Sequence, residues 1–292
     1  RHVEALRNDV TSLAASGTGG EFVWVRRSGD PIDVVEATCR EFEASVVSVN
    51  RDASAYRQQR DTQVARGLAG HGRILDSHDG LTVHPPGSVL TSKGTLSKVF
   101  SAFYRAWASA PLDPWPDTGT DTATGMSVGG SSGAHDRLDR WLQIVDDYHI
   151  TRDDLDDRAT SHLSSDLKFG TIAARTVVES VGDHTPGRAA FTRQLAWRDW
   201  WFHTLFQRPE IVDRSVRPEF DRIEWLNDSG DLEAWRAGMT GYPLVDAGMR
   251  QLDATGWLPG RIRMVCASFL IKHLLVDWRL GERYFRRRLI DA

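Results

Sequence analysis

The chain has 292 residues, a net charge of −4 and a hydrophobic fraction of 40%, a composition typical of soluble globular proteins. Its length favours two domains over one. It holds no run of about 18 apolar residues, so we expect no membrane span, and its first residues lack the apolar core of a secretory signal. The two cysteines, Cys39 and Cys266, lie far apart, which favours a reducing cytoplasm of bacterial type.

Predicted helices and strands alternate along the first hundred residues. A strand, a helix and a second strand within about 30 residues form a βαβ unit, which implies a parallel sheet. The glycines at 17–20 precede a strand, so they are typical of a turn and not of a phosphate loop. The expected elements are a helix at 1–15, a strand at 22–25, a helix opened by Asp30 and Pro31, a strand at 45–49, a helix at 54–69 and a strand at 73–76.

The composition changes near residue 108. Residues 108–135 are rich in Pro, Thr, Asp, Gly and Ser, which is typical of a linker. Beyond residue 135 the apolar side chains recur at helical spacings only. We therefore predict an α/β domain with an incomplete parallel sheet at 1–107, an interdomain linker at 108–135 and an all-helical domain at 136–292.

Hydroxyl side chains gather at residues 160–165, where a helix is predicted to begin, and Gly170 suits its end. The unpaired N–H groups of a helix start, together with hydroxyl donors, suit a phosphate group. Ordinary helix capping is the more common explanation of such residues. The sequence leaves both interpretations open.

Gln194, Trp197, Arg198 and Trp201 share one face of a predicted helix, because they are spaced at i, i+3, i+4 and i+7. This face suits a flat, hydrogen-bonding guest such as a nucleobase. A buried helix with a satisfied polar pair is the alternative. Seven of the eleven tryptophans lie within 197–278, a density that suits either core packing or an electron relay.

The segment 235–264 has a residue order too specific to be generic: WRAGMTGYPLVDAGMRQLDATGWLPGRIRM. It resembles the flavin domain of the DNA photolyase and cryptochrome family, as do TSHLSSDLKFGTI, RQLAWRDWW and ASFLIKHLLVDWRLGERYF. The resemblance is strong over 136–292 and weaker over 22–107. It implies an α/β antenna-type domain followed by an all-α FAD-binding domain.

The resemblance implies a deoxyribodipyrimidine photolyase, a lyase that uses light and FAD to split cyclobutane pyrimidine dimers in UV-damaged DNA by electron transfer. The alternatives are a cryptochrome-type blue-light photoreceptor without repair activity and a helical scaffold without cofactor. The family implies an antenna chromophore, a folate or a deazaflavin, and Asn50 is either a contact to it or a turn residue. We expect a monomer, no metal and no membrane association.

Cofactor residues follow from the resemblance. Arg263 and Asp291 match an ion pair beside the flavin ring, where a cation stabilises the anionic reduced form. The pyrophosphate of FAD is expected at the hydroxyl-rich turn. The other expected FAD contacts are Tyr148, Thr160, Ser161, His162, Leu163, Ser164 and Arg198.

DNA and electron-transfer residues follow in the same way. Trp197 matches a residue that packs on the flipped dimer, since photolyases act on an extruded lesion. Trp225 and Trp278 match the outer and middle members of a tryptophan chain that reduces the flavin. The expected DNA contacts are Arg152, Gln194, Trp197, Trp201, Gly260 and Arg261.

Three positions depart from the family pattern. His162 stands where the family usually has arginine, and Gln194 stands where dimer photolyases carry a glutamate that bonds the lesion. Pro259 and Gly260 replace the usual histidine and asparagine. The changes at Gln194 and Gly260 favour the photoreceptor alternative. We also expect a chain cut at both ends, because the family's first strand and inner tryptophan are missing.

Overall fold

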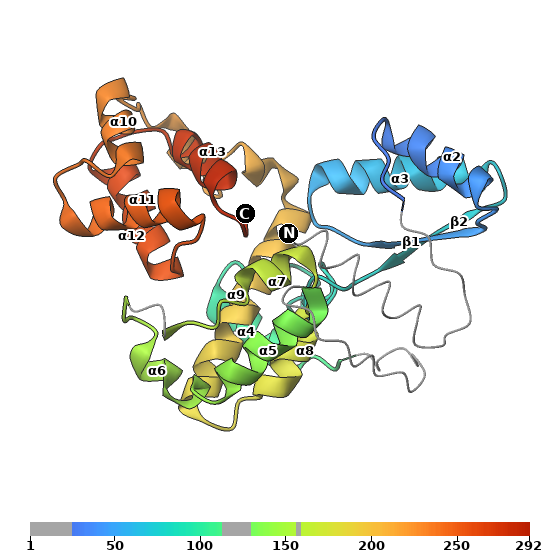
Figure 1. Cartoon of the computed structure of the whole chain (residues 1–292), viewed down its shortest axis with the longest axis horizontal. Helices are drawn as coiled ribbons and strands as arrows, with labels where there is room; N and C mark the ends of the chain where they lie inside the picture. Colours follow the sequence, from blue (N-terminus) through green and yellow to red (C-terminus); the bar gives the residue numbers. More distant parts are fainter. Residues whose placement is uncertain (1–24, 113–129, 156–158) are drawn as a thin grey trace.

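A computed structural model describes residues 25–112, 130–155 and 159–292 (Figure 1). The predicted helix at 1–15, the turn at 17–20 and nearly all of the strand at 22–25 lie outside these residues. The described chain forms an α/β unit and two groups of helices. In Figure 1 the α/β unit is blue, the first helical group runs from α4 to α9, and the second group, α10 to α13, is orange and red.

The α/β unit confirms the later part of the predicted pattern, the strand near 45–49, the helix near 54–69 and the strand near 73–76. Strands β1 and β2 pair in parallel, with Val46 opposite Ile74. The carboxylate of Asp30 caps α2 by accepting a hydrogen bond from the backbone N–H of Ile32 at 2.9 Å, and Pro31 occupies the first turn as expected. The elements are α2 (Pro31–Glu41), β1 (Val46–Asn50), α3 (Ala55–Ala69) and β2 (Ile74–His78).

The first helical group has one hydrophobic core, built around the long helix α9. Thr185 caps α9 by accepting from the N–H of Arg188 at 3.3 Å. Phe191 and Leu195, which share one apolar stripe of α9 at a spacing of four residues, are buried in this core. The elements are α4 (Phe100–Ser109), α5 (Gly130–Leu142), η1 (Val145–Asp147), α6 (Tyr148–Thr151), α7 (Ser164–Phe169), α8 (Ala174–Val181) and α9 (Pro186–Gln207).

Helix α4 packs with the helices, although residues 1–107 were expected to form the α/β domain. Phe100, Phe103 and Trp107 belong to the same buried cluster as α9. Within the expected linker at 108–135, α4 runs to Ser109 and α5 begins at Gly130. The expected domain boundaries stay a prediction. Residues 113–129 lie outside the described chain.

The second helical group has its own core, centred on the fully buried Trp235. The indole N–H of Trp235 donates to the backbone oxygen of Cys266 at 3.0 Å, which ties α10 to α12. Helix α13 approaches closely because Gly281 faces Leu270, where a Cβ would lie 2.5 Å from Leu270 Cδ2. The elements are η3 (Pro209–Val212), η4 (Pro218–Arg222), α10 (Ser229–Ala237), α11 (Pro243–Thr255), α12 (Gly260–Lys272) and α13 (Trp278–Arg288).

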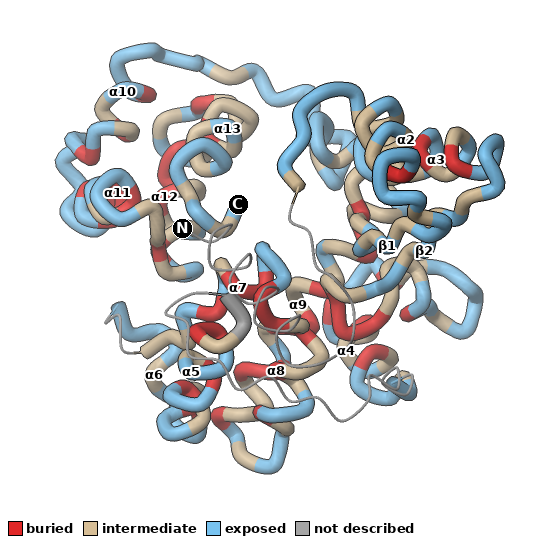
Figure 2. Tube along the Cα trace, turned by 45° about the vertical axis from the view of Figure 1, so that its right-hand side comes forward, coloured by how far each residue is buried: buried red, intermediate tan, exposed pale blue. Residues whose placement is uncertain are grey.

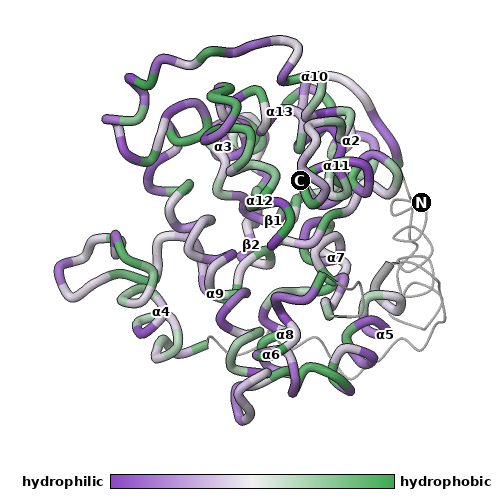
Figure 3. Tube along the Cα trace, turned by 90° about the vertical axis from the view of Figure 1, so that its left-hand side faces the viewer, coloured by the Kyte–Doolittle hydropathy of each residue, from purple (hydrophilic) through white to green (hydrophobic). Residues whose placement is uncertain are grey.

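Buried residues concentrate along α7, α9 and α12, whereas the trace of the α/β unit is largely exposed or intermediate (Figure 2). Hydrophilic and hydrophobic residues alternate along the helices (Figure 3). Within the described ranges, no helix combines the length and the apolar character needed to cross a membrane. The same residues contain no group of three or more His, Cys, Asp or Glu side chains arranged to hold a metal ion.

Candidate functional site

The two helical groups meet at the hydroxyl-rich turn. The imidazole of His162 lies against the indole of Trp257, with ring centroids 4.4 Å apart and planes tilted by 33°. His162 has a φ of 54°, a left-handed conformation that is uncommon outside glycine and often marks a functional turn. This contact brings the turn before α7 beside the loop that leads into α12, although the two segments are distant in sequence.

The turn itself has the predicted form. Helix α7 begins at Ser164, and Gly170 ends it with a φ of 72°. The N-cap residue is Leu163, which is buried, and no side chain caps this helix. Among the described residues, Ser161 Oγ accepts a long hydrogen bond, 3.4 Å from the N–H of Leu163. Ordinary capping therefore does not account for the hydroxyls gathered here.

Arg198 of α9 fixes the turn against the α/β unit. Its two terminal nitrogens donate to the backbone oxygens of Leu81, at 2.5 Å, and Leu167, at 3.1 Å. Burial lowers the pKa of this guanidinium from its ordinary value, an effect opposed by the nearby carboxylate of Asp199. Arg198 thus positions α7, and its expected contact to the cofactor stays a prediction.

Arg263 and Asp291 form the predicted ion pair. A terminal nitrogen of Arg263 lies 2.7 Å from Asp291 Oδ2, and its Nε donates to the backbone oxygen of Leu258 at 2.8 Å. The Asp291 side chain is only 2% exposed, yet its second oxygen, Oδ1, has no hydrogen-bond partner within the described chain. Buried carboxylate oxygens rarely lack a partner, so this oxygen suits a ligand that brings an N–H group.

The isoalloxazine ring of FAD carries such an N–H group. The donor set around Asp291 therefore fits this cofactor. We conclude that the residues present are compatible with a bound flavin.

Gln194, Trp197 and Trp201 lie on α9 as predicted, and a ring from α4 contacts Trp197. Trp197 is half-buried and stacks on Phe100 of α4, with centroids 3.7 Å apart and planes 10° apart. Gln194 is half-buried, and its amide nitrogen makes a long bond of 3.4 Å to the backbone oxygen of Ala190. Trp201 is 47% exposed. One face of the Trp197 indole is thus covered by the buried ring of Phe100.

The two arginines expected to bind DNA both lie near the carboxylate of Asp153. Arg261, at the start of α12, pairs with Asp153, and the Nε of Arg152 lies 3.9 Å from the same carboxylate. All three side chains are substantially exposed, with 36% to 60% of their area accessible. Gly260 begins α12 on this face, and a Cβ added there would meet nothing within 4 Å. A phosphate bound here would compete with Asp153.

Tyr148 lies directly behind this arginine pair. Its ring packs edge-on against Trp141 and Phe191, each with centroids 5.4 Å away. Burial raises the pKa of the phenol, while the positive charges of Arg152 and Arg261 oppose that rise. The phenol therefore stays neutral at physiological pH and is suited to hydrogen bonding.

The two relay tryptophans lie on adjacent segments. The N–H of Leu226 donates to the backbone oxygen of Leu275 at 2.9 Å, and the N–H of Asp277 donates to the Asn227 side chain at 2.8 Å. These bonds hold the segment that carries Trp225 against the start of α13, where Trp278 lies. Both indoles are half-buried.

Sequence reasoning missed Asp199, which is fully buried. Its Oδ2 accepts from the indole of Trp107 at 3.0 Å and from the backbone N–H groups of Val83, at 2.9 Å, and His84, at 3.3 Å. Burial raises the pKa of this carboxyl to about 6. A signal was present, because Asp199 lies four residues beyond Leu195 on the apolar stripe, where an acid is out of place.

Comparison with known proteins identifies two matching family models and several similar proteins. Residues 2–119 match the family model described as DNA photolyase, and residues 191–292 match the FAD binding domain of DNA photolyase. The chain is 37% identical to the deoxyribodipyrimidine photo-lyase of Streptomyces griseus, covering 94% of this chain and 65% of that protein. The chain thus spans slightly less than two thirds of the length of that relative.

Two solved structures are also similar. A bacterial class III photolyase from Agrobacterium tumefaciens has a TM-score of 0.83 at 31% identity, covering all of this chain and 68% of the other. A Synechocystis cryptochrome has the same TM-score at 23% identity, which shows a shared fold alone.

One family model thus covers the α/β unit and the other covers α9 to α13, so both parts of the described chain match the same class of protein. The chain belongs to the DNA photolyase family.

Proposed function

We propose that this chain carries out light-driven repair of UV-damaged DNA, splitting cyclobutane pyrimidine dimers with FAD as its cofactor. The observation that carries the proposal is the buried Arg263–Asp291 pair with its unpartnered carboxylate oxygen. Similar proteins are a deoxyribodipyrimidine photo-lyase and a class III photolyase, which supports the same activity. A monomer inside the cell remains our hypothesis for its state and location.

The cofactor would lie where the two helical groups meet. The turn of Thr160, Ser161 and Ser164, with the His162 and Leu163 backbone, would hold the pyrophosphate, and Arg263 and Asp291 would hold the ring. Reduced FAD supplies light absorption and a single transferable electron. The guanidinium of Arg263 favours negative charge beside it, because opposite charges attract strongly in a partly buried site.

The lesion would bind on the exposed side of α9. Trp197 offers a flat surface that Phe100 holds rigid, and one aromatic stack on a base is worth about 1–3 kcal/mol. Gln194 beside it supplies an amide donor and acceptor for a base edge. Trp201, exposed one turn further on, would contact the neighbouring strand.

Arg152 and Arg261 would bind the DNA backbone. Contacts to phosphates position a protein without reading sequence, which suits an enzyme that searches for damage at any sequence. Release of Asp153 from the two arginines would accompany this step, because a phosphate and the carboxylate occupy the same donors.

Trp278 and Trp225 would pass electrons inward from the surface. The hydrogen bonds between residues 226–227 and 275–277 keep the two indole-bearing segments together. Asn50 ends β1, where its side chain lies against Gly80. An antenna chromophore at that edge, folate or deazaflavin, stays a prediction.

The decisive experiment uses the chain reconstituted with FAD, reduced, and illuminated with an oligonucleotide that contains one thymine dimer. We expect light-dependent recovery of thymine absorbance, with no recovery in the dark. Trp197→Ala is the informative variant: it should weaken lesion binding while FAD absorbance is retained. A chain that binds FAD but leaves the dimer intact in light contradicts the repair proposal.

A cryptochrome-type photoreceptor is the second candidate. Gln194 and Gly260, which stand where dimer photolyases carry glutamate and asparagine, favour it. It predicts flavin photoreduction through Trp225 and Trp278 without preferential binding of dimer-bearing DNA. Measuring both in one preparation separates the two functions.

A further inference from the structure

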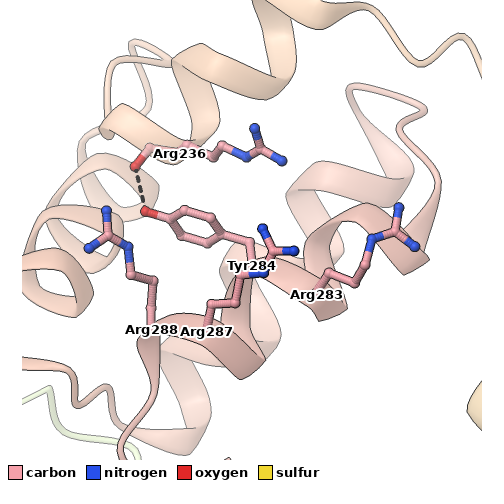
Figure 4. Close-up of a pocket in the computed structure, with 5 residues that line it drawn as sticks. All are labelled: Arg236, Arg283, Tyr284, Arg287 and Arg288. Atoms are coloured by element: carbon pink, nitrogen blue, oxygen red, sulfur yellow. Dashed lines mark hydrogen bonds between the residues drawn. The ribbon is translucent and has the colours of Figure 1, made fainter.

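A hollow of about 460 Å³ lies on the second helical group, between α10 and α13 (Figure 4). Its lining consists of five residues, four of them arginines: Arg236, Arg283, Tyr284, Arg287 and Arg288. No acidic side chain is among them. These residues are separate from the turn at 160–164, from α9 and from the pair at Arg263, so the hollow is not part of the site already described.

Tyr284 organises the hollow. Its hydroxyl donates to the backbone oxygen of Arg236 at 3.3 Å, and Figure 4 shows this bond closing the space between α10 and α13. The guanidinium carbons of Arg236 and Arg288 each lie 5.6 Å from the centroid of the Tyr284 ring, within cation–π range. The ring also packs edge-on against the fully buried Trp235, at 5.6 Å. The centre of the hollow is therefore rigid.

Two of the arginines have acidic partners outside the hollow. Arg236 pairs with Glu233 at 2.5 Å, and Arg288 pairs with Asp253 at 2.8 Å. These pairs hold their guanidinium groups in place. The Nε of Arg236 is buried and has no hydrogen-bond partner within the described chain. A buried donor without a partner is costly and calls for an acceptor.

Arg283 and Arg287 have no acidic partner among the described residues. They lie one turn apart on α13, where like charges destabilise a helix. The helix dipole accounts for basic residues in the last turn of α13, but it does not account for Arg283 or for the arrival of Arg236 from another helix. An anion within the hollow would neutralise the charges of Arg283 and Arg287, which have no acidic partner among the described residues.

We propose that this hollow is a binding site for a small phosphate-bearing molecule. Guanidinium groups bind phosphate through paired N–H bonds, and several of them around one space favour a group with more than one negative charge. The volume lies within the range of small-molecule sites, about 300–1,000 Å³. A di- or triphosphate matches the charge and size of the hollow.

The test is calorimetric titration of the chain with inorganic tripolyphosphate, compared with the double variant Arg283→Gln/Arg287→Gln. Loss of two charge-assisted contacts should weaken binding about tenfold or more. Arg286→Gln is the matched control for the two single variants Arg283→Gln and Arg287→Gln, because it removes one positive charge from the same helix outside this hollow. It should bind tripolyphosphate as the unaltered chain does. Thermal unfolding of each variant verifies that the fold is kept.

Two results would overturn the proposal. One is tripolyphosphate binding that is absent, or that weakens equally in Arg283→Gln, Arg287→Gln and Arg286→Gln, which would indicate a diffuse charge effect. The other is binding of a short single-stranded DNA, but not of tripolyphosphate, that depends on Arg283 and Arg287, which would assign the hollow to a nucleic-acid backbone. Neither readout involves FAD or repair, so failure here leaves the proposed function untouched.

Discussion

The indole of Trp197 stacks on the ring of Phe100, with centroids 3.7 Å apart and planes 10° apart. Phe100 is 6% exposed and belongs to the main helical core, so it holds one face of the indole in place. The expected lesion wall is therefore built from two helices, α4 and α9.

The first prediction concerns this support. Phe100→Leu should destabilise the fold by about 1–3 kcal/mol and weaken dimer binding several-fold, because an unsupported indole stacks less well. Phe103→Leu is the control: Phe103 is equally buried on the same helix but faces His203. Urea unfolding and lesion-affinity titration check both variants. Equal losses of affinity would show that Phe100 matters only for stability.

The second prediction concerns the Arg263–Asp291 pair. Arg263→Met leaves a buried carboxylate without its cation and should cost up to about 3–5 kcal/mol of unfolding free energy. Adding Asp291→Asn should recover part of that loss, since no buried charge then remains. Denaturant unfolding of the unaltered chain, both single variants and the double variant, all without FAD, measures the coupling. Strict additivity would mean that the two side chains do not interact.

The third prediction is a pH dependence set by Asp199 and His203. The pKa of Asp199 is raised by burial from 3.8 to about 6, so between these values the folded chain holds a proton that the unfolded chain has lost. Stability from this group therefore falls as pH rises. The pKa of His203 is lowered by burial from 6.5 to about 4, so its contribution rises with pH over nearly the same window.

In the unaltered chain, the contributions of Asp199 and His203 to the pH dependence of the unfolding free energy have opposite signs. Asp199→Asn removes the falling slope, so its unfolding free energy should rise by up to about 3 kcal/mol between roughly pH 4 and pH 6.5. In His203→Gln only the Asp199 contribution remains, so the unfolding free energy should fall over the same pH range. Urea unfolding at several pH values compares the three proteins. One common pH profile for all of them would rule out control by this pair.

The fourth prediction concerns Gly260. Because a Cβ at this position meets nothing within 4 Å, Gly260→Asn should fold as well as the unaltered chain. Asparagine also favours a helix slightly more than glycine does. Under the proposed function it should tighten lesion binding, since an amide then faces the substrate. Gly281→Asn is the contrast: its Cβ would lie 2.5 Å from Leu270, so unfolding should occur at lower denaturant. Unchanged lesion affinity in Gly260→Asn would remove this position from the site.

Local spacing along the chain was sufficient to predict several features. The βαβ unit, the helix that ends at Gly170 and the shared face of Gln194 and Trp197 follow from repeats of two or 3.6 residues and from turn chemistry. The order of motifs in 235–264 identified the family. These are properties of residues near one another in sequence, so no knowledge of packing was needed.

Only the tertiary structure decided which distant segments meet. Phe100 lies under Trp197, and Asp199 gathers donors from a loop and from α4. Arg236 of α10 faces the arginines of α13 across one hollow. Such pairings depend on how whole helices pack, because the direction of a helix in space is set by the shape of its neighbours and not by its own periodicity.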